Sequence, residues 1–76
     1  MADGERVRIE IGFDGGQIMS ALVETGAATQ LEQALAGGSD GALALEAEDG
    51  RYTVALGRVI YVKRFTREGR VGFTGV

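Results

Sequence analysis

Two aromatic residues and three cations alternate near the end of the sequence, and residues of these types could bind nucleic acid. They are Tyr61, Lys63, Arg64, Phe65 and Arg67. Aromatic rings stack on exposed bases while cations neutralise phosphates, so the arrangement is typical of a surface for single-stranded nucleic acid. A core tyrosine beside a charged strand edge, which discourages aggregation, accounts for the same residues. We prefer this second interpretation and keep nucleic-acid binding as the alternative function.

The sequence offers little for catalysis or metal binding. It contains no cysteine and no histidine, which excludes thiol nucleophiles, thiolate zinc sites and imidazole bases. Lys63 would need a desolvated pocket to act as an amine nucleophile, and the sequence gives no sign of one. Four carboxylates gather in one region without the alternate-position spacing of a calcium loop: Asp40, Glu46, Glu48 and Asp49. We therefore predict no enzyme, no catalytic residue, no metal and no cofactor.

The length of the chain favours self-association. Seventy-six residues make a single domain, 1–76, near the lower limit of what one hydrophobic core can stabilise. No disulfide can add stability, so extra burial in an oligomer is expected. Residues 1–6 lack the apolar core of a signal peptide, and no apolar run is long enough to span a membrane. We predict a cytoplasmic protein.

Charge is unevenly distributed along the chain. Residues 1–50 carry two cations and ten carboxylates, whereas residues 51–76 carry six cations and one carboxylate. The basic third could face phosphate, or it could face the acidic part of the same fold or of a neighbouring subunit. We favour the second interpretation because nucleic-acid domains are usually basic and this chain has a net charge of −3.

The first half of the sequence predicts a β-hairpin. Residues 6–13 alternate strictly between apolar and polar types, which predicts a half-buried strand. The "FDGG" stretch at 13–16 has the glycines of a phosphate loop, but it joins two strands and therefore reads as a hairpin turn. The second strand, 17–24, is apolar on both faces, so one face needs a cover. We assign Met19, Ala21 and Val23 to an interface with a partner.

A short helix and a second hairpin follow. Thr29 with Glu32 forms the pattern of a capping box, which predicts a helix over 30–36 that ends at Gly37. Residues 42–48 and 51–56 have strand patterns and are joined by the "DG" turn at 49–50. We expect this small helix to pack on the sheet, because two turns are not stable alone.

Residues 52–65 contain an apolar pattern that Arg58 interrupts. In one straight strand Arg58 would be buried among apolar side chains, so we expect a reversal or sharp bulge at 57–58, with a positive φ at Gly57. A two-residue turn there would pair Leu56 with Val59 and Val54 with Tyr61. Ile60 and Val62 then share the opposite face and join the predicted interface.

A last strand is expected at 70–73. The predicted fold class is mainly β (α+β), a small antiparallel sheet or open barrel of order β-β-α-β-β-β-β.

Four segments resemble an uncharacterised family of small actinobacterial proteins, a domain of unknown function. They are "VRIEIGF", "LEQALAGG", "DGRYTVALGRVIYV" and "GRVGFTG". The family opens with a V-x-I-G-V type strand and closes with R-x-V-G-F-G, and the resemblance would span nearly the whole chain. It implies no established activity.

A second resemblance is to Sm-like and SH3-like small barrels. "RVRIEIGFDGGQIMSALVE" is similar to their first strands and "VALGRVIYV" to their closing hairpin. This resemblance implies binding of RNA or peptides, commonly as rings. Taken together, the sequence predicts a non-enzymatic β module that acts in protein–protein assembly as a homo-oligomer or small subunit. The alternative is an Sm-like or other nucleic-acid-binding module.

Overall fold

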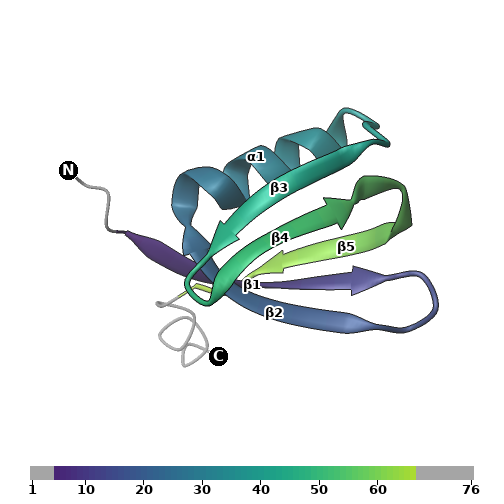
Figure 1. Cartoon of the computed structure of the whole chain (residues 1–76). Coiled ribbons are helices and arrows are strands. Elements are labelled where there is room, and N and C mark those ends of the chain that lie inside the picture. The colour runs from purple at the N-terminus through teal and green to yellow at the C-terminus, as the bar shows by residue number, and fades with distance from the viewer. Residues whose placement is uncertain (1–4, 67–76) are drawn as a thin grey trace, which may run out of the picture.

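Five antiparallel strands and one α-helix make up residues 5–66, the part of the chain that the computed structural model describes (Figure 1). The strands form one sheet in the order β4-β3-β2-β1-β5, so the last of the described strands lies beside the first. The predicted fold class, mainly β with a single helix, is confirmed. The predicted strand at 70–73 lies outside the described residues. In chain order, the elements are β1 (Arg6–Phe13), β2 (Ile18–Glu24), α1 (Thr25–Ala36), β3 (Ala42–Ala47), β4 (Gly50–Ala55), the 3₁₀ turn η2 (Leu56–Arg58) and β5 (Val59–Arg64).

The β1–β2 hairpin follows from the alternating sequence and the glycine turn. Its register pairs Arg6 with Glu24 and Gly12 with Ile18. Gly15 and Gly16 both adopt φ near +90°, a conformation that other residues rarely tolerate, so the turn requires glycine. The predicted boundaries of both strands agree with the structure to within one residue.

The core lies between the inner face of the sheet and helix α1. The odd-numbered residues of β1 and β2 point to this side, and α1 contributes Ala28 and Leu31, which are fully buried. Figure 1 shows α1 lying across one side of the sheet, next to β3. Helix α1 is twelve residues long, and no helix within residues 5–66 could cross a membrane.

The helix begins earlier than the sequence predicts. Its first residue is Thr25, directly after β2, and Glu24 is the N-cap residue without a side-chain capping bond. Thr29 therefore lies in the second turn and forms no capping box with Glu32. The predicted end is close to the observed one, although the left-handed residue is Gly38, with φ of +78°, and not Gly37.

The predicted hairpin between residues 51–56 and 59–65 is wrong. Strand β4 pairs with β3, whereas β5 crosses to the other edge of the sheet and pairs with β1. The turn η2 makes this crossing, and Gly57 does not have a positive φ. Arg58 is exposed at this corner, where its guanidinium lies 3.2 Å from the carboxylate of Asp14. A single straight strand over residues 52–65 would have buried Arg58. The chain avoids this burial because it changes strand partner at η2.

A bulge in β5 completes this rearrangement. Phe13 pairs with Val59 and Gly12 with Tyr61, so Ile60 is an extra residue between the two pairs. An extra residue in one strand shifts the later side chains relative to the partner strand. Val59 and Val62 both pack against the core, whereas Ile60 is 66% exposed.

Candidate functional site

The outward side of strands β5, β1 and β2 carries exposed aromatic and apolar residues. Its positions are the even-numbered residues of β1 and β2, together with Tyr61, Lys63 and Phe65. Ile18 is 61% exposed and Tyr61 is 40% exposed, which are high values for large apolar side chains. We call this surface the aromatic face.

Tyr61 is held in one place on the aromatic face by two neighbours on β1. Its hydroxyl donates a hydrogen bond of 2.5 Å to the carboxylate of Glu10. Its ring lies over Gly12 so closely that a Cβ atom on residue 12 would overlap the ring atoms. The hydrogen bond to Glu10 is the main cause that raises the pKa of Tyr61 above its ordinary value. An aromatic ring fixed in this way loses little conformational entropy on binding a partner.

Lys63 and Phe65 form a second cluster on the same face. The Nζ atom of Lys63 lies 4.5 Å from the centre of the Phe65 ring, within cation–π distance. The backbone N–H of Phe65 donates to the carbonyl of Arg8, and Arg8 pairs with Leu22 on β2. The aromatic face therefore continues from Tyr61 to Phe65 with Lys63 and Arg8 among the rings.

Arg64, a neighbour of these residues in the sequence and a candidate for the same nucleic-acid surface, lies on the other side of β5. Its guanidinium donates to both carboxylate oxygens of Glu32, at 2.9 and 3.0 Å, and to the hydroxyl of Thr29 at 3.1 Å. These bonds tie the end of β5 to helix α1. Arg64 thus has a structural role, and Arg67 lies outside the described residues. Three of the five candidate nucleic-acid residues come together on the aromatic face: Tyr61, Lys63 and Phe65.

The structure also places the five residues that we assigned to an interface. Ala21 and Val23 are buried in the core of the single chain, under α1, so they form no surface. Met19 and Val62 are half-buried against the same core, and Ile60 is exposed. Both faces of β2 are indeed apolar, but the outward one holds Ile18 and Leu22. Which face α1 would cover could not be predicted from the apolar pattern of β2, because both faces carry large apolar residues.

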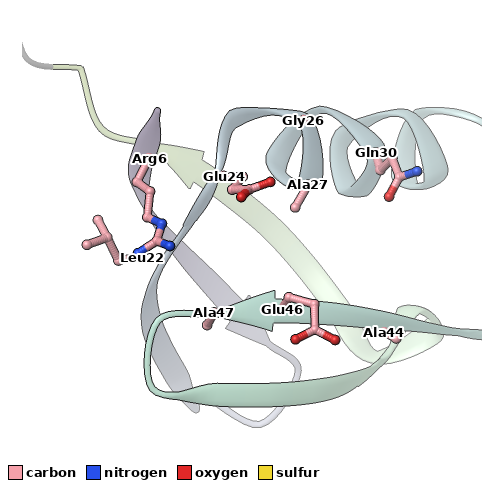
Figure 2. Close-up of a pocket in the computed structure, with 9 residues that line it drawn as sticks. All are labelled: Arg6, Leu22, Glu24, Gly26, Ala27, Gln30, Ala44, Glu46 and Ala47. Atoms are coloured by element: carbon pink, nitrogen blue, oxygen red, sulfur yellow. The ribbon is translucent and has the colours of Figure 1, made fainter. Parts of the chain in front are cut away.

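A groove lies between helix α1 and strand β3 (Figure 2). Strands β2 and β3 meet at the pair Val23–Ala47 and diverge beyond it. The groove has a volume of about 560 Å³, and its walls come from the start of β1, the end of β2, the first two turns of α1 and β3. Small side chains, among them Ala27 and Ala44, leave this space open. We call it the α1–β3 groove.

Charged residues at the rim of the α1–β3 groove are mostly acidic. Glu24 and Glu46 line it, and Arg6 lies at one end (Figure 2). Arg6 approaches Glu48 at 3.7 Å, and Glu46 accepts a hydrogen bond of 2.6 Å from Arg51. The groove could not be predicted from the sequence, because it lies where two strands that are separated by the helix diverge.

Three of the four acidic residues that we compared with a calcium loop, Glu46, Glu48 and Asp49, have other partners. Asp49 accepts a hydrogen bond from Tyr52, and this bond is the main cause that raises the pKa of Tyr52. Among residues 5–66 no three histidine, cysteine or acidic side chains are grouped so that they could hold a metal ion.

Comparison with models of protein families, with curated proteins and with solved structures found no match to this chain.

Proposed function

We propose that this chain is a non-enzymatic β module that acts in protein–protein assembly by self-association through the aromatic face. The observation that carries the proposal is the exposure of Tyr61 and Ile18 on either side of Gly12. Rigid tyrosines and large apolar residues that are exposed together are typical of the centre of a protein interface. The resemblance to Sm-like small barrels, which commonly form rings, agrees with the proposal.

The charges on the aromatic face favour a second copy over nucleic acid. Arg8 and Lys63 lie on this face, but so do the carboxylates of Glu10 and Glu24. In a symmetric contact the cations of one copy can approach the carboxylates of the other, because the same surface is used twice. A phosphate backbone would instead meet Glu10 at the centre of the surface, and like charges repel it.

Sedimentation of the full chain tests the proposal. We expect a dimer or larger species at micromolar concentration, and Ile18→Glu should shift it to the 8.0 kDa monomer without loss of folding. Gln33→Glu, on the exposed side of α1, adds the same charge elsewhere and should leave assembly unchanged. A wild-type monomer up to millimolar concentration would refute self-association, as would an Ile18→Glu variant that assembles normally.

The alternative function, nucleic-acid binding, is tested by measuring the affinity for a mixed single-stranded oligonucleotide at two salt concentrations. We expect no binding that depends on the aromatic face. A steep loss of affinity with added salt, together with weaker binding by Lys63→Gln, would identify that face as a nucleic-acid surface and overturn the proposal.

A further inference from the structure

We propose that the α1–β3 groove binds an extended, basic segment of a partner protein, which adds a strand to the free edge of β3. The groove adjoins the aromatic face and shares Arg6, Leu22 and Glu24 with it, but its proposed occupant binds the edge of β3 and does not require the proposed self-association. It rests on three observations: backbone groups of β3 that face the groove, the size of the groove and its acidic rim.

The backbone direction of β3 follows from its pairing with β4. The N–H of Leu56 donates to the carbonyl of Gly41, and the register then pairs Leu43 with Val54 and Leu45 with Tyr52. Hydrogen-bonded pairs occur at every second residue of an antiparallel ladder. The N–H and C=O groups of Ala42, Ala44 and Glu46 therefore point away from β4, toward the groove.

Within residues 5–66, β2 uses these groups only at the corner where it pairs with β3. The two strands are paired at Val23 and Ala47, and the N–H of Glu48 donates to the carbonyl of Leu22 at the same corner. From there toward Ala42 the edge of β3 has no strand neighbour among the described residues. An unpaired strand edge of this kind is a template for an extended peptide.

The groove has room for such a peptide. An added strand lies about 4.8 Å from its neighbour. Gly26 and Ala27 on α1 and Ala44 on β3 carry no side chain long enough to fill that space (Figure 2). Its volume of about 560 Å³ is within the range of about 300–1,000 Å³ that is common for binding pockets.

The charged residues at the rim of the groove favour a peptide that carries a positive charge. The groove is lined by two carboxylates, those of Glu24 and Glu46, and by one cation, Arg6. Arg51 already neutralises Glu46 in part, so Glu24 is the principal partner for a lysine or arginine on the peptide. A partner segment with one basic residue among β-branched residues fits both the edge and the rim.

The probe is a capped peptide, acetyl-Thr-Val-Lys-Val-Thr-amide, added to the full-length protein. Amide NMR signals of Ala42, Ala44 and Glu46 should shift on titration, and the Ala44 amide should gain protection from exchange. Replacing the lysine by glutamate should weaken binding at least fivefold. Methylating alternate peptide nitrogens, which removes the pairing N–H groups, should weaken it at least tenfold. No shift at millimolar peptide, or equal binding of the methylated peptide, would overturn the proposal.

Two variants test the site from the side of the protein. Ala44→Pro removes a groove-facing N–H without removing a β3–β4 hydrogen bond, and should abolish binding. Ala27→Leu fills the groove from α1 and should have the same effect if the proline variant fails to fold. Ala36→Leu, at an exposed position of α1, is the matched control and should bind normally. Protection of the Ala44 amide without peptide would show that the edge is already covered, by a second copy if it rises with protein concentration, and would also overturn the proposal.

Discussion

The ring of Tyr61 occupies the space that a side chain on Gly12 would need. The two residues are direct neighbours on β5 and β1, and Gly12 is buried although it points outward, because the ring covers it. Glycine in the middle of a strand is otherwise unfavourable. At this position it allows a tyrosine to lie against the sheet and present its ring to a partner.

Gly12→Ala should lower the free energy of unfolding by about 1–3 kcal/mol, because the new methyl group overpacks against Tyr61. The same change in a Tyr61→Ala background should be neutral or stabilising by about 0.5–1 kcal/mol, since alanine is then favoured over glycine. Urea denaturation of the four proteins measures this coupling. Equal effects of Gly12→Ala in both backgrounds would show that the ring does not occupy this space.

The two tyrosines should titrate above their ordinary pKa of about 10, Tyr61 because of Glu10 and Tyr52 because of Asp49. Each folded pKa exceeds the unfolded one. The stabilisation is therefore complete below about pH 10 and is lost as the pH rises through the folded pKa. Tyrosinate absorbance measures both transitions. Glu10→Gln should lower the pKa of Tyr61 alone, and Asp49→Asn that of Tyr52 alone. Ordinary titration of both tyrosines in the wild type would contradict the two hydrogen bonds.

Arg64→Gln should lower the free energy of unfolding by about 0.5–1 kcal/mol, a modest value because the pair with Glu32 is partly exposed. Thr29→Ala should cost less than about 0.5 kcal/mol, whereas the loss of a true N-cap costs about 1 kcal/mol. Chemical denaturation midpoints of both variants show whether Thr29 is an N-cap residue or a partner of Arg64 in the second turn of α1. A cost of 1 kcal/mol or more for Thr29→Ala would place the start of the helix at that residue.

Gly38→Ala should destabilise the protein by about 1–2 kcal/mol, because Gly38 has a φ of +78°. Gly57→Ala should change stability by less than about 0.5 kcal/mol, since a Cβ there would meet Asp40 only at an ordinary contact distance of 3.9 Å. Thermal melting curves of the two variants, recorded together, test the ranking. The reverse order would restore the sharp reversal at residue 57 that the sequence predicts.

Local patterns in the sequence were sufficient for both hairpins. Strict alternation in residues 6–13 identifies one buried face, and glycine-rich turns fix where the chain reverses. The partner of β5 could not be predicted in this way. Alternation reports that a face is buried, not which strand lies beside it, and the strand partner of residues 59–64 is more than forty residues earlier in the chain.

The candidate sites were predictable only in part. The outward placement of Arg8 and Glu10 follows from alternation, and Tyr61, Lys63 and Phe65 alternate in the same way. Which face of β2 remains exposed depends on where α1 packs, a contact between distant segments. The structural role of Arg64 could not be predicted from residue type. Its partners Thr29 and Glu32 also fitted the pattern of a capping box, which assigned them another role.

The pairing of β1 with β5 has a consequence for how the chain folds. Ile9 and Arg64 are neighbours in the sheet although 54 residues lie between them. Contacts of such long sequence separation close large loops, and they slow folding relative to helical proteins of the same size. During synthesis β1 lacks its second neighbour until β5 leaves the ribosome. The sheet is therefore completed only after β5 has been synthesised, and strands β1 and β2 are exposed to aggregation until β5 arrives.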